Sequence, residues 1–203
     1  MAIPTREEMY RALEERHGAE YQKKLSAASV AVCGLGGLGS NIAIALARAG
    51  VGKLHIIDFD TVDISNLNRQ QYFPDDIGMP KAEALAAHLR RLCPAIDAVA
   101  LLERMTDQTA DGMVARADFW LECFDAPESK RLVAERALLA GKRVFSASGM
   151  GGFGGPAMRR RDVGLLTVVG DFASDIADHP PLAPRVTQAA AMMADAVVEW
   201  VLA

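Results

Sequence analysis

In the segment CGLGGLGSN, residues 33–41, a cluster of glycines joins an apolar run to an alanine-rich segment. The preceding residues SVAVC (29–33) predict a buried strand, and the alanine-rich segment predicts a helix. Gly34, Gly36 and Gly39 fit the spacing GxGxxG, in which glycine permits a tight turn and lets backbone N–H groups approach a phosphate. The loop therefore predicts phosphate binding, but it serves NAD-binding and ATP-consuming proteins alike.

Segments of strand and helix character alternate along the rest of the chain. Strands are expected at 29–33, 53–58, 96–103, 118–124, 142–148 and 164–170, and helices at 40–50, 80–93, 107–116, 127–140 and 184–202. Such alternation is typical of βαβ units and of a parallel sheet covered on both faces. The sequence predicts an α/β fold with a Rossmann-like, doubly wound, mostly parallel sheet. The basic cluster MRRR (158–161) is interpreted as a solvated turn or edge.

Length and the N-terminal segment predict one domain with a short leading helix. The chain has 203 residues, of which 51% are apolar, so it can bury one full core. Residues 1–18 are expected to form a charged helix, since Thr5 and Glu8 have the spacing of a capping box and Gly18 can end the helix. Its apolar stripe is narrow and suits docking on a surface or a partner subunit. Residues 19–203 are predicted to form the single domain.

Composition argues against several classes of protein. The formal net charge of -4 disfavours a nucleic-acid-binding surface. No apolar stretch reaches the roughly 20 residues of a membrane span, and the N-terminal segment is charged, unlike a signal peptide. We therefore expect a cytoplasmic protein. The 3 cysteines lie far apart and form no CxxC pair, which favours reduced, buried cysteine and argues against a zinc site.

An acidic residue ends the second expected strand. Asp58 lies 24 residues after Gly34, where a carboxylate can accept hydrogen bonds from both ribose hydroxyls of a nucleotide. This feature does not distinguish NAD from ATP.

Two cations and a second carboxylate follow, and they favour a nucleoside triphosphate. The segments DFDTVDISNLNRQQYF (58–73) and GMPKAEA (78–84) supply Arg69 and Lys81, which a dinucleotide-binding protein does not need. An enzyme that cleaves a triphosphate does need them, because negative charge builds up on the phosphoryl group and the leaving group. Asp125, just past the fourth expected strand, suits a magnesium ion that bridges phosphates. Each residue alone also fits a solvated surface position or a helix cap, but together on strand ends they predict one site.

With these residues identified, the chain resembles the ThiF/MoeB family of the superfamily of ubiquitin-activating enzymes. The motifs that carry the resemblance are GLGGLGS (34–40), DFDTVDISNLNRQ (58–70), PKAEA (80–84) and CFDA (123–126). The similarity runs from about residue 16 to the end. The segments SGMGGFG (148–154) and LAPRV (182–186) are most like those of the compact ThiF-like sulfur-carrier adenylyltransferases.

The resemblance implies an enzyme that uses ATP to adenylate the C-terminal glycine carboxylate of a ubiquitin-like sulfur carrier of the ThiS type, in thiamine biosynthesis. The carboxylate would attack the α-phosphate and release pyrophosphate, and it needs no general base. The residues implied to bind the nucleotide are Gly34, Gly36, Gly37, Gly39, Asp58, Asp60, Asn66, Arg69, Gln70 and Lys81.

The resemblance also implies the groups that act on the phosphates. Arg69, Lys81 and Asp125 are the expected catalytic residues, with Asp125 binding Mg²⁺. Relatives add an N-terminal arginine from the dimer partner, for which Arg16 is the nearest candidate and Arg11 the alternative. A homodimer is therefore expected. The CxxC zinc pairs and the mobile cysteine loop of larger relatives are missing, so we expect no zinc and a separate sulfur donor.

Other functions remain open at this stage. The same chemistry fits another acceptor: a molybdopterin or cysteine-synthesis carrier, a peptide or a modified tRNA base. A non-catalytic partner subunit of an activating enzyme is a further reading, although such a scaffold has no use for Arg69, Lys81 and Asp125. A dehydrogenase is disfavoured by the segment from residue 60 to 81.

Overall fold

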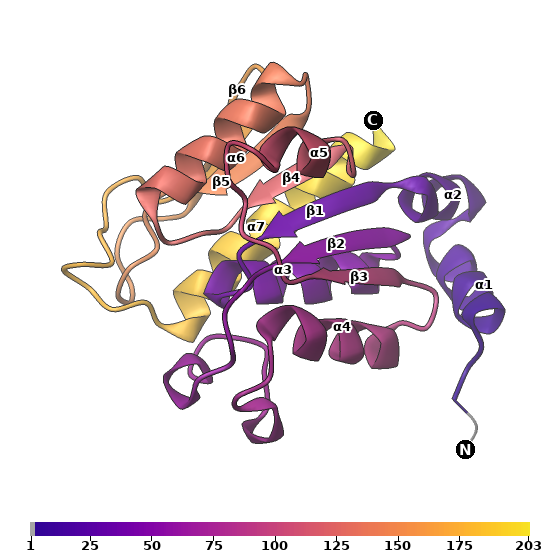
Figure 1. Cartoon of the computed structure of the whole chain (residues 1–203). Coiled ribbons are helices and arrows are strands. Elements are labelled where there is room, and N and C mark those ends of the chain that lie inside the picture. The colour runs from indigo at the N-terminus through magenta and orange to yellow at the C-terminus, as the bar shows by residue number, and fades with distance from the viewer. Residues whose placement is uncertain (1–2) are drawn as a thin grey trace.

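The strands form one sheet in the order β3-β2-β1-β4-β5-β7-β6 in the computed structural model, which describes residues 3–203 (Figure 1). β6 runs antiparallel to β7, and the other neighbouring strands are parallel. The strands are β1 (Ser29–Cys33), β2 (Lys53–Ile57), β3 (Asp97–Leu101), β4 (Phe119–Glu122), β5 (Arg143–Ala147), β6 (Arg159–Val163) and β7 (Leu166–Gly170). The helices are α1 (Arg6–His17), α2 (Ala19–Ala27), α3 (Gly37–Ala49), α4 (Lys81–Leu92), α5 (Ala110–Val114), α6 (Pro127–Leu139) and α7 (Ala183–Leu202). Two 3₁₀ turns, η1 (Ile64–Asn66) and η2 (Pro74–Asp76), lie between β2 and α4.

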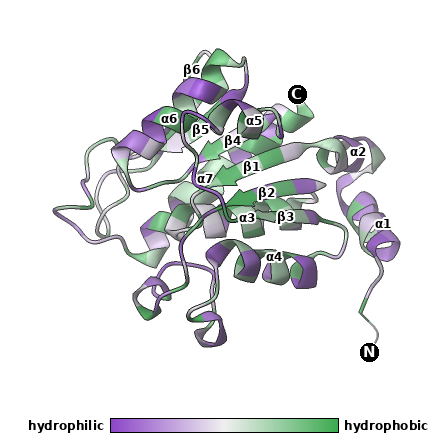
Figure 2. Ribbon diagram, viewed as in Figure 1, coloured by the Kyte–Doolittle hydropathy of each residue, from purple (hydrophilic) through white to green (hydrophobic). Residues whose placement is uncertain are grey.

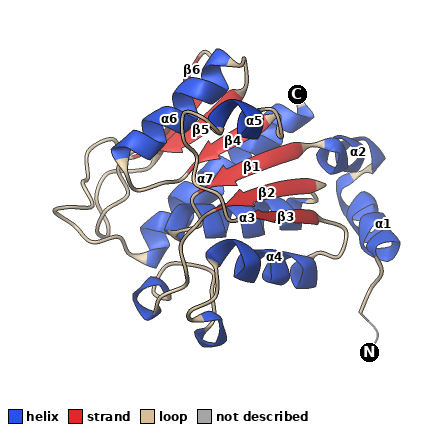
Figure 3. Cartoon of the chain, viewed as in Figure 1, coloured by secondary structure: helices blue, strands red, loops and turns tan. Residues whose placement is uncertain are grey.

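Helices cover both faces of this sheet (Figure 3). α3, α4 and α7 enclose the larger apolar core, to which Ile42, Leu85 and Met193 belong. α5 and α6 enclose a second core on the opposite face, around Met113 and Val133. β1 is largely green in Figure 2, whereas α1 is largely purple and buries none of its residues. The predicted α/β fold, with a doubly wound and mostly parallel sheet, is confirmed.

The N-terminal helix has the predicted cap. The N–H of Glu8 donates to Thr5 Oγ1 at 3.2 Å, and the Glu8 carboxylate accepts from the N–H of Thr5 at 2.7 Å. This reciprocal pair satisfies two backbone donors that a helix start leaves free. The helix spans Arg6–His17, and residues 1 and 2 of the predicted segment 1–18 lie outside the described residues. The division into 1–18 and 19–203 stays a prediction.

Three elements differ from the sequence-based expectation. α2 was not predicted, because it buries only Gln22 and Leu25 and so has no recognisable apolar stripe. α3 begins at Gly37 and not near Ser40, since its first turn consists of the glycine loop itself. β6 was not among the predicted strands, although its basic cluster lies at a solvated edge of the sheet, as interpreted.

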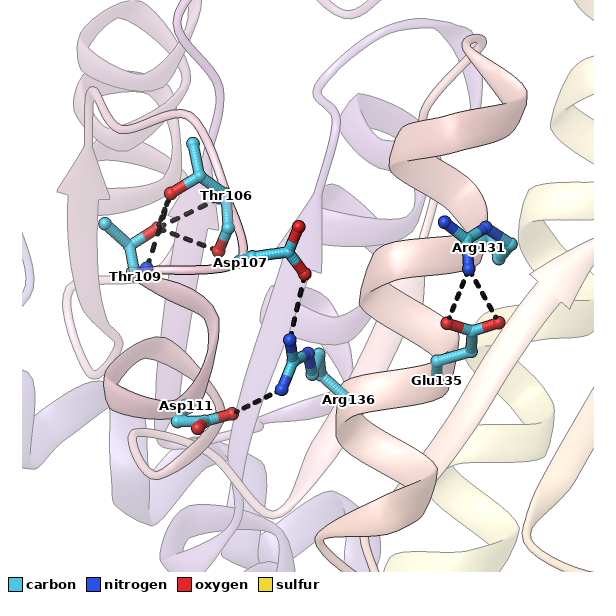
Figure 4. Close-up of polar contacts among 7 residues, drawn as sticks. All are labelled: Thr106, Asp107, Thr109, Asp111, Arg131, Glu135 and Arg136. Carbon is cyan, nitrogen blue, oxygen red and sulfur yellow. Dashed lines mark hydrogen bonds and ion pairs between the residues drawn. The ribbon is translucent and has the colours of Figure 1, made fainter.

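Exposed ion pairs lie on the surface of α5 and α6 (Figure 4). Arg136 contacts Asp107 at 2.9 Å and Asp111 at 3.6 Å, which ties α6 to α5 and to the segment before it. Arg131, which precedes Arg136 in α6, pairs with Glu135 at 2.9 Å. Exposed pairs of this kind contribute about 0–1 kcal/mol each, so they do not determine the fold. Among the described residues, no helix combines the length and apolar character needed to cross a membrane.

Candidate functional site

A cavity of about 340 Å³ lies where the chain reverses its order across the sheet. β1 and β4 are neighbours, yet the chain visits β2 and β3 before it returns to β4. Loops leaving two such strands diverge and open a crevice at their carboxyl ends. We call this space the switch-point cavity. The predicted residues that line it are Gly34, Gly36, Asp58, Asp60, Asn66, Arg69, Gln70, Lys81 and Asp125.

The glycine loop is required for two different reasons. Gly34 has a φ of +89°, and a Cβ there would lie 2.7 Å from the carbonyl oxygen of Cys123, so a side chain would separate β1 from β4. A Cβ on Gly39 would lie 1.9 Å from the carbonyl oxygen of Gly34. Gly36, in contrast, has only Gln70 Nε2 within range, at 3.7 Å. Gly36 therefore leaves open space at the start of α3, where backbone N–H groups and the helix dipole favour an anion.

Asp58 holds the glycine loop through a hydrogen bond to its backbone. The side chain is 5% exposed, and its carboxylate accepts from the N–H of Leu35 at 2.6 Å and from the N–H of Asp60 at 2.8 Å. Burial raises the pKa of this carboxyl, while these hydrogen bonds and Lys81 oppose the rise. Each oxygen can accept a further hydrogen bond, and Asp58 lines the cavity. Ribose binding by Asp58 stays a prediction, and its contact with Leu35 adds a role in shaping the loop.

Two cations line the cavity: Arg69 comes from the segment between β2 and α4, and Lys81 is the first residue of α4. Lys81 is 7% exposed, opens α4 and lies with Nζ 3.3 Å from Asp60 Oδ2. A cation at a helix start opposes the helix dipole, so local stability does not explain it. Arg69 is half-buried, and its Nη1 donates to the Asn68 side chain at 2.8 Å and to the carbonyl of Ser65 at 3.3 Å. Both side chains are thus held at the cavity wall with donors available to an anion.

Gln70 adds a polar group that lacks a partner. Its side chain is 8% exposed and lines the cavity, and its Oε1 is buried without a hydrogen bond. A buried amide oxygen left unsatisfied costs about 1–3 kcal/mol. The open space at Gly36, the start of α3 and the cations Arg69 and Lys81 together fit an anionic ligand such as a nucleotide.

The end of β4 supplies the acidic side of the cavity. Asp125 is exposed there, in the loop before α6. Glu122, which is 1% exposed, stiffens this loop by accepting from the N–H of Phe124 at 2.8 Å, from Ser146 Oγ at 2.7 Å and from Lys130 Nζ at 3.4 Å. Sequence reasoning missed this support, because Glu122 and Ser146 meet only when β4 and β5 pair.

A magnesium ion fits this arrangement only together with phosphates. Within residues 3–203, no group of three or more His, Cys, Asp or Glu side chains is placed to hold a metal by itself. Mg²⁺ typically binds one or two carboxylates and completes its shell with phosphate oxygens and water. Asp125 at the cavity wall suits that mode, and its role as a magnesium ligand stays a prediction.

An adjoining cavity of about 300 Å³ continues from the switch-point cavity. Both are lined by Arg69, Gln70, Cys123, Phe124 and Asp125. Other residues line the adjoining cavity but not the switch-point cavity. They include Gly37, Lys130, Met150, Ile176, Pro181 and Val186. Gly37 therefore faces this second space, and Gly39 lines neither cavity. The two spaces offer room for two reactants side by side.

Several lining residues were not predicted. They are Phe59, Cys123, Phe124, Ala126 and Ser129. Phe59 and Phe124 belong to the motifs that carry the resemblance, so the neighbouring site residues could have indicated that they line the cavity. Burial raises the pKa of the Cys123 and Cys33 thiols well above its usual value, which makes both poor nucleophiles.

The structure does not bring Arg16 to either cavity. Arg16 is exposed on α1, and this helix packs near Gly52 and Ala95, which precede β2 and β3. The cavities lie at the opposite, carboxyl ends of the strands (Figure 1). Within one chain, neither Arg16 nor Arg11, which pairs with Glu7, contributes to the site. A role for either in a partner subunit stays a prediction.

Comparison with known proteins identifies the family. Residues 10–201 match the ThiF family. The chain therefore belongs to the ThiF family of E1-like adenylyltransferases, as its motifs indicated. It is 39% identical over 138 residues to the sulfur carrier protein ThiS adenylyltransferase of Escherichia coli, covering 68% of this chain and 55% of that protein. It is 37% identical over 178 residues to the adenylyltransferase and sulfurtransferase MOCS3 of Bos taurus, covering 85% of this chain and 37% of that protein. The chain thus spans about a third to a half of the curated relatives that it matches.

Solved structures support the fold. The E. coli tRNA N6-threonylcarbamoyladenosine dehydratase TcdA, in complex with ATP, superposes with a TM-score of 0.86 at 20% identity, covering 100% of this chain and 97% of that chain. E. coli MccB with ATP superposes with a TM-score of 0.73 at 24% identity, covering 91% of this chain and 58% of that chain. Both of those proteins bind ATP on this fold.

Proposed function

We propose that this protein is an ATP-dependent adenylyltransferase that activates the C-terminal glycine carboxylate of a ubiquitin-like sulfur carrier of the ThiS type. One observation carries the proposal: Arg69, Lys81 and Asp125 meet around the open space at Gly36, in a single cavity. A dinucleotide-binding protein has no use for two cations and a carboxylate at that position. The similarity to named sulfur-carrier adenylyltransferases supports the choice of acceptor.

The chemistry asks the protein chiefly for positioning and charge neutralisation. The start of α3 and Gly36 would receive phosphate groups, with Arg69 and Lys81 beside them. Asp125 would hold Mg²⁺, which screens the charge of the phosphates when it is bound. Asp58 would fix the ribose. The carrier's carboxylate attacks the α-phosphorus, the bond to the leaving pyrophosphate breaks, and an acyl-adenylate forms, with no proton to be removed.

The adjoining cavity supports the presence of a second reactant. It shares Arg69 and Asp125 with the switch-point cavity, so an extended chain end lying there would present its carboxylate to the nucleotide. The cavity is small, about 300 Å³, which suits a tail of small residues such as Gly-Gly.

The reaction is proposed to stop at the acyl-adenylate, with sulfur delivered by a separate donor. Cys33, Cys93 and Cys123 are all free and buried, and none of them is placed like an exposed, cation-activated thiol. Buried free thiols are also typical of a reducing compartment, which supports a cytoplasmic location. The proposed role in thiamine biosynthesis is supported by the similarity to a ThiS adenylyltransferase.

A homodimer belongs to this proposal. α1 carries a narrow apolar stripe that includes Met9 and Leu13. These two side chains pack against the core but are only partly buried. Arg16 on the same helix would then reach the phosphates of the partner subunit. Light scattering tests this directly: a fully active monomer of about 22 kDa would remove both the dimer and the role of Arg16.

Two measurements test the proposed function. Calorimetric titration with ATP and Mg²⁺, and separately with NAD, should give binding for ATP alone. ATP–pyrophosphate exchange is then followed with E. coli ThiS as the carrier, and with ThiS lacking its last glycine as the control. Exchange that depends on the intact tail supports the assignment. ATP binding without carrier-dependent exchange would transfer the proposal to another acceptor, whereas NAD binding in place of ATP would end it.

A further inference from the structure

A buried ion pair stands outside the switch-point cavity and has no role in the chemistry above. Arg185, in the first turn of α7, is 7% exposed and donates through Nη2 to Asp171, which follows β7 and is fully buried. Burying two charges costs several kcal/mol for each ion before they attract one another. A cation in the first turn of a helix also opposes the helix dipole. The pair is therefore a costly way to stabilise a fold, and its purpose lies in what it holds.

Arg185 holds the glycine-rich loop between β5 and β6. Its Nη1 donates to the carbonyl oxygen of Gly154, and its Nη2 donates to that of Pro156 at 3.3 Å. These three acceptors, counting the Asp171 carboxylate, use the planar fork of the guanidinium in a way that a lysine cannot reproduce.

Asp171 holds the loop between β7 and α7. Its Oδ1 accepts from the N–H groups of Ala173 and Ser174, both at 2.8 Å, and its Oδ2 accepts from Ser174 Oγ at 2.7 Å. Burial favours a higher pKa, but these hydrogen bonds and Arg185 outweigh it and lower the pKa of Asp171 to about 2. The carboxylate is thus charged at every pH at which the enzyme would work.

The two loops lie directly against each other at the carboxyl end of the sheet (Figure 1). The N–H of Gly151 donates to Ser174 Oγ at 2.9 Å. A Cβ on Gly149 would lie 2.1 Å from Asp171 Oδ1, and one on Gly151 would lie 2.8 Å from the carbonyl oxygen of Asp175. Glycine is needed at both positions because its backbone lies against the Asp171 side chain at Gly149 and against the backbone of the second loop at Gly151.

These loops, together with the start of α7, form the outer wall of the adjoining cavity. Met150 comes from the first loop, Ile176 and Pro181 come from the second, and Val186 follows Arg185 in α7. One ion pair therefore fastens the three segments that supply this outer part of the wall. It does so without lining the switch-point cavity.

We propose that the Arg185–Asp171 pair is a positioning device for the acceptor, which fixes the wall of the adjoining cavity against which the acceptor's chain end lies. This rests on the proposed function, because it takes the adjoining cavity to be the acceptor's side of the site. The pair sets how well the carboxylate is delivered and leaves ATP binding to the switch-point cavity.

Hydrogen exchange tests the first half of the proposal without any substrate. Arg185→Met, Arg185→Lys and Asp171→Asn are compared with the wild-type full chain and with Arg131→Gln, an exposed arginine on α6 that lines neither cavity. In the Met and Asn variants, amides of residues 149–156 and 172–181 should exchange roughly tenfold faster or more, while those of β1 and α3 keep their protection. Unchanged exchange in these loops would overturn the proposal, and so would equal loss of protection in β1.

Kinetics test the second half, with E. coli ThiS as the carrier and ATP–pyrophosphate exchange as the readout. Arg185→Met and Asp171→Asn should raise the KM for ThiS about tenfold, with the KM for ATP within about threefold of wild type. Arg185→Lys should fall between, because it keeps the charge and loses the bonds to the loop carbonyls. A parallel rise of both KM values, or a loss confined to kcat, would overturn the assignment. If the wild-type enzyme shows no exchange that depends on ThiS, the proposed carrier is wrong. Hydrogen exchange then tests the Arg185–Asp171 pair by itself.

Discussion

Replacing Lys81 by methionine removes a buried ammonium group while it keeps most of the apolar length of the side chain. The charge is 7% exposed, stands at the start of α4 and has Asp60 as its partner at 3.3 Å. The loss of that pair costs about 0–1 kcal/mol, because the Asp60 side chain is 56% exposed and water can replace the lysine. Removing a cation from a helix start returns about 0.3–1 kcal/mol. The free energy of unfolding should therefore change by less than about 1 kcal/mol.

Activity should change far more than stability. If Lys81 lies beside the phosphates, the variant loses a charge that complements the transition state, which costs a hundredfold or more, or about 3 kcal/mol. Urea denaturation followed by circular dichroism gives the stability, and carrier-dependent ATP–pyrophosphate exchange gives the activity. Arg131→Gln is the matched control, since it removes an equal charge from the surface, and it should leave both quantities near wild type.

Two results would refute this reasoning. Exchange within about tenfold of wild type would mean that Lys81 does not act on the phosphates. A loss of stability of more than about 2 kcal/mol would mean that the ammonium group is needed by the fold, and that the helix-dipole argument for a functional cation fails.

Three further outcomes are expected. Asp125→Asn should lower exchange about a hundredfold and weaken the dependence of ATP binding on Mg²⁺ in calorimetry, whereas undiminished exchange would remove the metal role. Serine at Cys33, Cys93 and Cys123 together should leave exchange within roughly tenfold of wild type in protein that stays folded, because burial raises the pKa of Cys33 and Cys123 and no covalent step is expected. Since the pKa of Asp171 is lowered to about 2, its stabilisation is complete above its usual pKa of 3.8 and is lost as the pH falls toward 2. Urea denaturation should show that Asp171→Asn costs about 2–5 kcal/mol at pH 7 and less at pH 3, and a cost that is equal at both pH values would contradict the charge pair.

The sequence predicts the fold well wherever periodicity and glycine spacing act locally. The strands around the glycine loop are clear because they are buried on both faces, so their apolar runs are continuous. α2 could not be predicted from apolar periodicity, since Gln22 and Leu25 are its only buried residues. The cluster of Arg159 to Arg161 is solvated, as interpreted, but the strand that it forms by pairing with β7 could not be predicted from these residues.

Some residues of the candidate site could also be predicted from the sequence, and others could not. Arg69, Lys81 and Asp125 could be predicted, because each belongs to a short motif at a strand end or a helix start. The unpartnered Oε1 of Gln70 and the bond from Arg185 to Asp171 could not be predicted. These features depend on how loops from distant strands meet, and neither burial nor partner identity is encoded in local spacing.

The burial of all three thiols has a practical consequence. Cys33, Cys93 and Cys123 are 0%, 4% and 5% exposed, so the natural chain already serves as a background for site-specific labelling. A single cysteine introduced at an exposed position of the loop after β7 would react selectively with a maleimide dye, without prior removal of the native thiols. A second dye on α6, paired with the first, would then report by energy transfer whether that loop moves when nucleotide or carrier arrives. Conformational change in the native sequence thereby becomes accessible to single-molecule fluorescence.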